Sequence, residues 1–127
     1  MTDHAEPKGL LAIRVVAMPA DTNANADIFG GWLVSHMDLA GGCESVRRAS
    51  CRTVTVAIDG MTFIKPVKVG DVVCCYTDLI KVGRTSMQFQ IECWTISLQH
   101  TDRLKVAAGT FTYVAIDENG VPQPVDR

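Results

Sequence analysis

The residues with the clearest chemical potential lie between positions 21 and 42. There, a polar loop leads through Gly30 and Gly31 into an apolar segment that contains one carboxylate, Asp38. A carboxylate in apolar surroundings is costly unless it is paired or hydrated. If the segment is a helix, the positions three, four and seven residues from Asp38 hold one valine and otherwise only glycine and serine. Two interpretations fit this bare stripe: it leaves room for a ligand beside the acid, or it allows a strand or helix to pack closely while Asp38 pairs with an arginine.

Gly30 and Gly31 mark the expected start of that helix. A helix N-terminus carries N–H groups without partners and a partial positive charge, and glycine lets a ligand approach the backbone closely. Such a site can polarise a carbonyl and stabilise the oxyanion that forms when the carbonyl is attacked. Asp38 lies about 10 Å further along the helix axis. A carbonyl held at the helix start would therefore need an acid from a partner subunit, or a loop that folds back.

Other polar residues of this region have less specific signals. Asn23 and Asn25 can cap a turn or orient a water molecule, and the sequence does not choose between these roles. His36 lies roughly 200° round the helix from Asp38, so we expect a packed or partly exposed histidine. The histidines are too scattered for a metal site, and none is predicted. The chain also lacks a GxSxG elbow, a phosphate-binding glycine loop and an HExxH motif.

The composition indicates one domain, residues 1–127, with a loose polar tail at 1–8 and a C-terminal tail at 118–127. The net charge of −2 argues against broad nucleic-acid binding. No apolar run reaches the roughly 18 residues of a membrane span, and the N-terminus lacks an apolar signal segment, so we expect a cytoplasmic protein. The number of cysteines is odd, so we interpret them as small buried hydrophobic residues of a protein in a reducing compartment. The cysteines are Cys43, Cys51, Cys74, Cys75 and Cys93.

Hydrophobic periodicity predicts the elements that hold the central region in place. An apolar run at 10–18 predicts a first strand that ends at Pro19. The helix is expected from Gly30 or Gly31 to about Arg48, and because apolar residues surround most of its axis it is expected to be buried. Four strands follow at about 54–63, 72–82, 86–95 and 104–116, and a shift of apolar parity predicts a β-bulge near Gly60.

This order of elements predicts an α+β domain. Because short turns join the last four strands, we expect them to form an antiparallel meander. A long central helix would then be wrapped by a curved antiparallel sheet of about five strands. Such a sheet leaves part of the helix and the edge strands uncovered, so we expect a second copy of the chain to cover them.

The motifs along the chain together resemble those of YciA-type acyl-CoA thioesterases, which have the hotdog fold. The resemblance covers about residues 10–116, and no single motif within it is specific. It implies hydrolysis of an acyl-CoA thioester, a role in lipid metabolism, and a long helix wrapped by an antiparallel sheet. The motifs are Asn23-Ala24-Asn25, Asp27-Ile28-Phe29-Gly30-Gly31-Trp32-Leu33, Met37-Asp38, Phe63-Ile64-Lys65-Pro66, Val69-Gly70-Asp71 and Val82-Gly83-Arg84-Thr85-Ser86.

The resemblance also implies roles for residues of the central region. Asp38 matches the acidic catalytic residue, which would act as a general base or as a nucleophile. Asn23 matches a loop asparagine that would help to position water or substrate across a subunit interface. The backbone at Gly30 and Gly31 would polarise the thioester carbonyl. In such dimers the helix start and the acid come from different subunits, and the family commonly assembles as hexameric trimers of dimers. Coenzyme A is part of the substrate, and no cofactor is implied.

The phosphates of coenzyme A require cations and backbone donors. A turn that carries a cation and two hydroxyl residues offers the best local candidates, and two lysines come next. The alternative is that this turn is only a hairpin with a solvated charge. The candidate residues are Gly83, Arg84, Thr85 and Ser86, followed by Lys65 and Lys81.

Two departures from the family pattern carry expectations. Ala26 stands where the family usually has glycine, so we expect ordinary backbone angles there. The chain ends soon after Pro124, without the longer extension of some relatives, which bears on contacts to the adenine.

The alternative function is a non-catalytic acyl-CoA-binding hotdog module that acts as a sensor or partner protein. A hotdog dehydratase is a third hypothesis, and it requires a histidine that faces the substrate.

Overall fold

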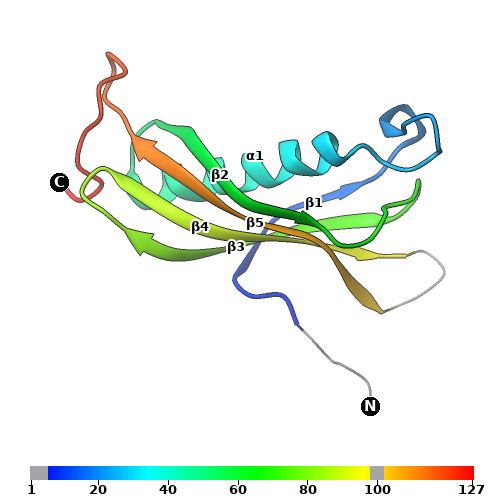
Figure 1. The fold of residues 1–127 in the computed structure, drawn as a ribbon. Helices are drawn as coiled ribbons and strands as arrows, with labels where there is room; N and C mark the ends of the chain where they lie inside the picture. Colours follow the sequence, from blue (N-terminus) through cyan, green and yellow to red (C-terminus); the bar gives the residue numbers. More distant parts are fainter. Residues whose placement is uncertain (1–5, 98–101) are drawn as a thin grey trace.

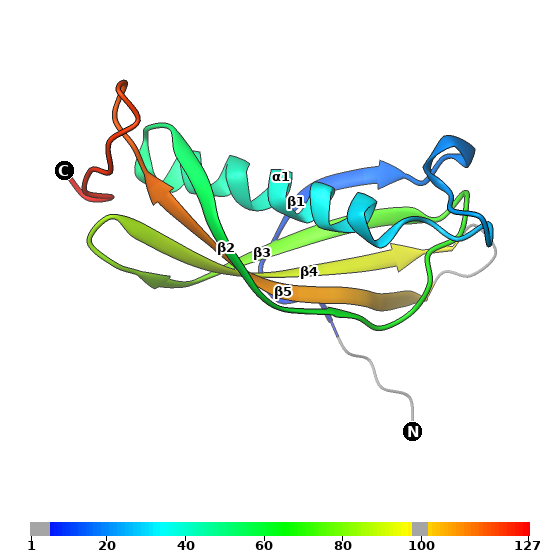
Figure 2. The same cartoon turned by 45° about the horizontal axis from the view of Figure 1, so that its top comes forward.

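The structure is a computed structural model that describes residues 6–97 and 102–127. One long helix lies across one face of a curved, five-stranded antiparallel sheet (Figures 1 and 2). The elements are β1 (Leu10–Val16), the short 3-10 helix η1 (Pro19–Asp21), α1 (Gly30–Ala49), β2 (Thr53–Phe63), β3 (Val72–Val82), β4 (Ser86–Ile96) and β5 (Arg103–Ala115). The α+β class and the helix-on-sheet arrangement expected from the sequence are confirmed.

The strand order differs from the predicted meander. Across the sheet the order is β1-β3-β4-β5-β2, so β3, β4 and β5 form a meander while β2 pairs with β5 at one edge. The connection at 64–71 is too long for a hairpin turn. It carries the chain past the start of α1, where the Ile28 N–H group donates to the Val67 carbonyl. The bulge predicted near Gly60 is confirmed, because the β2–β5 register shifts between Asp59 and Thr62, and Gly60 has a φ of 60°.

α1 is covered by its own sheet on one side only. Leu33, Met37 and Ala40 face the sheet and are buried, whereas Leu39 is 57% exposed and Val46 is 44% exposed. One curved sheet contacts only one face of a helix, so part of α1 is uncovered in the single chain, as expected, and α1 is not buried on all sides as its apolar pattern predicts. The outer apolar residues remain available to another surface.

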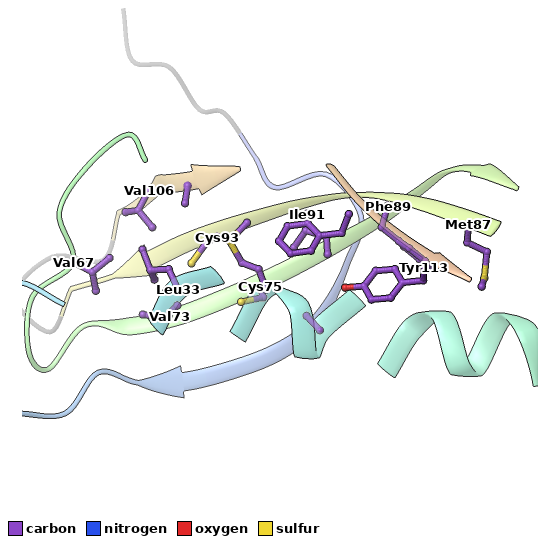
Figure 3. Packing of buried hydrophobic residues seen from close by; sticks show 14 of the residues in the cluster. Leu33, Val67, Val73, Cys75, Met87, Phe89, Ile91, Cys93, Val106 and Tyr113 are labelled. Atoms are coloured by element: carbon purple, nitrogen blue, oxygen red, sulfur yellow. The ribbon is translucent and has the colours of Figure 1, made fainter. Parts of the chain in front are cut away.

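The core lies between α1 and the concave face of the sheet (Figure 3). The alternation predicted for β4 is confirmed, because Met87, Phe89, Ile91 and Cys93 all face this core and are buried. The cysteine prediction is correct in part. All five are free thiols, and Cys74, Cys75 and Cys93 are buried, but Cys51 is half-buried and Cys43 is exposed on the outer side of α1.

Both ends of the described chain contact the sheet or the helix. The Lys8 N–H group donates to Glu92 Oε1 at 3.3 Å, and Glu6 pairs with Arg103 at 3.6 Å. Val125 is buried near the C-terminus. The predicted loose tail falls mostly at 1–5, which lies outside the described residues. Within the described ranges, no helix has both the length and the apolar character needed to cross a membrane.

Candidate active site

Asp38 lies half-buried on the flank of α1 that faces β2 and β5. Its Oδ1 atom accepts hydrogen bonds from Thr55 Oγ1 of β2 at 2.7 Å and from the Tyr113 hydroxyl of β5 at 3.0 Å. The same hydroxyl lies 2.9 Å from the Asp38 backbone carbonyl oxygen. No cation pairs with Asp38 among residues 6–97 and 102–127, so the arginine partner considered from the sequence is not found there.

The bare stripe beside Asp38 has two different uses. A Cβ atom at Gly41 would lie 2.2 Å from the Tyr113 hydroxyl, so this glycine permits close packing of a strand. Ser45 is also buried, and its hydroxyl lies 2.6 Å from Thr53 Oγ1. A Cβ atom at Gly31 or Gly42 would meet nothing within 4 Å in the described chain. The close-packing interpretation is therefore correct for Gly41 and Ser45, while Gly31 and Gly42 leave open space.

A surface cavity of about 530 Å³ opens beside Asp38. Its walls come from α1, including Leu39, Gly42 and Val46, and from Thr53 and Thr55 of β2. Because Thr55 and Tyr113 both donate to Oδ1, the other oxygen, Oδ2, has no hydrogen-bond partner within the described residues. The site thus combines a partly buried carboxylate, one free oxygen and an apolar wall, which is an arrangement that can activate a nucleophile.

The start of α1 has the properties expected of an anion or oxyanion site. Phe29 is the N-cap residue, and no side chain caps the helix. The first hydrogen bonds run from the N–H groups of Trp32 and Leu33 to the Phe29 carbonyl. Within the described part of the chain, the N–H groups of Gly30 and Gly31 have no acceptor. A Cβ atom at Gly30 would lie 3.2 Å from the Phe63 ring, so glycine allows this ring to approach.

Asn23 holds the loop that precedes the helix. Its Oδ1 atom accepts hydrogen bonds from the N–H groups of Asn25 at 2.9 Å and Asp27 at 3.2 Å. This confirms the turn-capping role considered from the sequence. The side-chain NH₂ group has no partner among the described residues and remains available to a ligand. Lys68 pairs with Asp27 and ties the loop to the 64–71 connection.

The Asn23 loop and the helix start share a second cavity. It has a volume of about 320 Å³ and is lined by Asn23, Gly30, Phe63 and Lys65 among others. Asp38 does not line this cavity. Within one chain, the expected carbonyl-binding elements and the expected acid therefore lie in two separate cavities on the same helix.

Ala26 contradicts the expectation of ordinary backbone angles. Its φ is 64°, in the left-handed region where residues with a side chain are strained. The turn needs this conformation because the Ala26 N–H group donates to the Asn23 carbonyl and the Asn23 N–H group donates to the Asp27 carbonyl. The tight turn decides the backbone angle, and the alanine side chain is accommodated in solvent.

The residues expected to bind phosphate do not converge within one chain. Gly83 to Ser86 form the turn between β3 and β4, closed by the Gly83 N–H group donating to the Ser86 carbonyl at 2.8 Å. The Arg84 carbonyl accepts from the Val125 N–H group, which places the turn at the C-terminal end of α1 (Figure 1). The hairpin interpretation is thus correct for the backbone, Arg84 and Lys81 are exposed, and Lys65 lies near the other end of the helix.

His36 is a packed, partly exposed residue, as expected. Its Nδ1–H group donates to the Trp32 carbonyl at 2.9 Å, and its ring lies 4.2 Å from the Trp32 ring. His36 lines neither the cavity beside Asp38 nor the cavity at the helix start. The described residues therefore hold no histidine of the kind that the dehydratase hypothesis requires.

Thr55 and Tyr113 are site residues that the sequence did not reveal. Thr55 belongs to the alternating run of β2, and its position directly after the helix is a weak signal that it faces α1. Tyr113 is 75 residues from Asp38 in sequence, so no local pattern links them. Burial, followed by the nearby charge of Asp38 and the hydrogen bond to it, raises the pKa of Tyr113, so the hydroxyl stays a donor.

Known proteins match most of the length of this chain. The profile of the thioesterase superfamily matches residues 25–99. The sequence is 49% identical over 122 residues to the acyl-CoA thioester hydrolase YciA of Salmonella typhimurium, covering 94% of this chain and 92% of that protein.

Solved structures are similar over nearly the whole chain. The hexameric thioesterase y2039 from Yersinia pestis superposes with a TM-score of 0.91 and 51% identity, covering 94% of this chain and 97% of that one. A hexameric hotdog fold thioesterase of Campylobacter jejuni superposes with a TM-score of 0.85 and 35% identity, covering 91% and 90% of the two chains. The helix-on-sheet arrangement described above is the hotdog fold.

Proposed function

The chain belongs to the thioesterase superfamily, and we propose that it hydrolyses the thioester bond of acyl-coenzyme A to a free acid and coenzyme A. The single observation that carries the mechanism is the Asp38 carboxylate in its cavity, with Oδ1 held by two hydroxyl donors and Oδ2 free. A non-catalytic acyl-CoA-binding module would not need a carboxylate in this state.

In the general-base route, Asp38 Oδ2 takes a proton from water as the water oxygen adds to the thioester carbonyl carbon. The carbonyl oxygen becomes an oxyanion, the C–S bond then breaks, and the thiolate of coenzyme A leaves and takes up the proton that Asp38 Oδ2 holds. In the nucleophilic route, Asp38 Oδ2 attacks the carbonyl carbon, the C–S bond breaks and the thiolate of coenzyme A leaves; water then hydrolyses the resulting anhydride, which releases the acid and restores Asp38. Both routes use the same free oxygen and need no cofactor.

The oxyanion donors are the N–H groups of Gly30 and Gly31 at the positive end of α1. The free NH₂ group of Asn23 lies in the same cavity and orients the water or the carbonyl. Because this cavity is separate from that of Asp38, the active site combines the helix start of one chain with the acid of another. β2 supports this arrangement, since it is a sheet edge with exposed apolar residues such as Val56.

We propose a dimer in which two β2 edges meet, and a trimer of such dimers like the hexameric relatives. In that assembly Arg84, Thr85 and Ser86 of the β3–β4 turn bind coenzyme A phosphates at a neighbouring chain's site, helped by Lys81 and Lys65. Exposed cations at a turn suit this role because phosphate binding needs charge without burial. The free cysteines support a reducing cytoplasmic location.

The test measures release of free coenzyme A from a panel of acyl-CoA substrates. The wild-type protein is compared with Asp38→Asn, which keeps the shape of the side chain but removes the base. Asp102→Asn, an exposed carboxylate that directly precedes β5, is the matched control. We expect Asp38→Asn to lose at least about 100-fold in kcat, equivalent to roughly 2.7 kcal/mol of barrier, while Asp102→Asn retains activity.

Each alternative predicts a different result. A wild-type protein that binds acyl-CoA without turnover would support the sensor or partner module. Full activity in Asp38→Asn would remove Asp38 from the mechanism while leaving the thioesterase activity in place.

A further inference from the structure

Tyr113 of β5 reaches Asp38 from the core side of the sheet, and we propose that it is a positioning residue that holds the Asp38 carboxylate in its reactive orientation. The inference rests on the proposed thioesterase activity at Asp38. Tyr113 does not line the cavity beside Asp38, so it acts through the carboxylate and has no access to substrate there.

The position of the Tyr113 hydroxyl is set by the packing of its buried ring. The residue is 1% exposed, and its ring packs edge-on against Phe89 at 5.8 Å. Figure 3 shows the ring beside Phe89 in the core, with the hydroxyl directed toward α1. From this position the oxygen lies 3.0 Å from Asp38 Oδ1 and 2.9 Å from the Asp38 carbonyl oxygen. A buried ring that cannot swing away makes a rigid hydrogen-bond donor.

The helix contains a glycine where this hydroxyl arrives. A Cβ atom at Gly41 would lie 2.2 Å from the Tyr113 hydroxyl and 2.7 Å from Ile91 Cδ1. Glycine weakens the interior of a helix relative to alanine. Gly41 therefore lowers the stability of α1 at one turn, and its missing side chain leaves the space through which Tyr113 contacts Asp38.

A phenol has one proton and here has two acceptors on the same residue. While Asp38 is ionised, the proton points at Oδ1, which also accepts from Thr55. When Oδ2 has taken a proton from water, Oδ1 becomes a weaker acceptor, and the hydroxyl turns to the Asp38 carbonyl oxygen. Neither state leaves the buried hydroxyl without a partner. Tyr113 thus holds Oδ1 while the carboxylate is ionised and takes up the proton, and Thr55 continues to donate to Oδ1 afterwards.

The ionisation behaviour of the phenol agrees with this role. Burial and the charge of Asp38 both raise the pKa of Tyr113. The hydroxyl therefore keeps its proton wherever the enzyme works, and it donates to the acid without competing for the proton of water.

The decisive variant is Tyr113→Phe, which removes the hydroxyl and keeps the ring. Because hydrogen bonds to charged groups are the strong ones, we expect kcat to fall roughly 10- to 100-fold. KM should change by less than about twofold, because Tyr113 is buried and does not line the cavity beside Asp38. Tyr76→Phe makes the same change at the only other tyrosine and should leave both constants unchanged. A merely structural loss would lower the thermal midpoint and the active fraction, and a lower active fraction also lowers the apparent kcat at constant KM, so kcat is calculated per titrated active site.

Two further variants keep the test decisive if Tyr113→Phe folds poorly. In the Asp38→Asn background, Tyr113→Phe should lower the residual kcat by less than about twofold, because the hydroxyl acts only through the carboxylate. Gly41→Ala retains the hydroxyl but displaces it, and it should lower kcat while KM is retained.

The outcomes separate this inference from the proposed function. An active wild-type enzyme, an inactive Asp38→Asn variant and an unchanged kcat in Tyr113→Phe or Gly41→Ala would overturn the role of Tyr113 alone. A wild-type protein that releases no coenzyme A would overturn the proposed function and this inference together.

Discussion

The side chains around Asp38 orient its carboxylate without neutralising its charge. Thr55 and Tyr113 hold one oxygen with hydroxyl groups. An arginine in their place would neutralise the negative charge that a base or nucleophile uses. Two neutral donors orient the carboxylate and keep its charge. At the scale of single residues, the Asp38 carboxylate is therefore held in one orientation and remains able to act as a base or nucleophile.

Ala26 is a residue-scale feature that can be tested by stability. Its left-handed backbone conformation is unfavourable for alanine and easily adopted by glycine. Glycine also has a more flexible unfolded chain, which offsets part of the gain. We expect Ala26→Gly to raise the free energy of unfolding by about 1 kcal/mol, measured by chemical denaturation.

The matched control for this prediction is Ala24→Gly in the same loop. Ala24 is exposed and is not among the residues with positive φ, so glycine there should destabilise the protein slightly. Equal destabilisation by both substitutions would contradict the strain at Ala26.

At the scale of elements, the C-terminal segment links the end of α1 to the β3–β4 turn. Arg127 donates to the Ala49 carbonyl at 2.8 Å, at the negative end of the helix dipole. Arg48 pairs with Asp126 at 2.8 Å, and the Val125 N–H group donates to the Arg84 carbonyl. The helix end and the turn that we propose for phosphate binding are therefore held in register by the same segment.

The Arg48–Asp126 pair predicts a small pH dependence of stability. The hydrogen bond from Arg48, and then its charge, lower the pKa of Asp126 below its ordinary value. A carboxyl group with a lowered folded-state pKa adds stability above its unfolded pKa of about 4, and this is lost as the pH falls further. We expect the stability advantage of wild type over Asp126→Asn to be present at neutral pH and to vanish in acid.

Thermal unfolding of the two proteins across this pH range measures the effect. Both side chains are exposed, so the advantage should also shrink in about 0.5 M salt. An advantage that persists in acid or in high salt would show that Asp126 acts by some means other than this ion pair.

At the scale of the whole molecule, the two cavities on α1 lead to a prediction about mixed assemblies. Asn23→Ala damages the cavity at the helix start, and Asp38→Ala damages the cavity of the acid. If each active site takes one cavity from each of two chains, a mixed dimer retains one intact site and one doubly damaged site. Co-expression of the two inactive variants should therefore restore about a quarter of wild-type activity.

The control is co-expression of two differently tagged Asp38→Ala chains, which should remain inactive. Assemblies that are purified through both tags should have about a quarter of the wild-type activity, because about half of their dimers are mixed and each mixed dimer has one intact site. Mixed dimers with no activity would mean that Asn23 and Asp38 serve the same site within one chain.

Local patterns predicted the elements because they reflect local physics. The alternation of Met87, Phe89, Ile91 and Cys93 identifies both the strand and its core face. The parity shift at Gly60 correctly predicts a bulge, because one extra residue reverses the side-chain alternation. Asp38 was identified as a candidate because a carboxylate in an apolar helix is costly.

The sequence by itself thus determined the order and bounds of the elements, the unusual acid and, through its motifs, the family. Only the tertiary structure decided that β2 pairs with β5, that α1 leaves Leu39 exposed, and that Tyr113 meets Asp38 through the space at Gly41. These facts depend on contacts between residues far apart in the chain, such as the 75 positions between Asp38 and Tyr113. Periodicity shows which face of an element is apolar, but the element that covers this face is selected by the packing of the whole molecule.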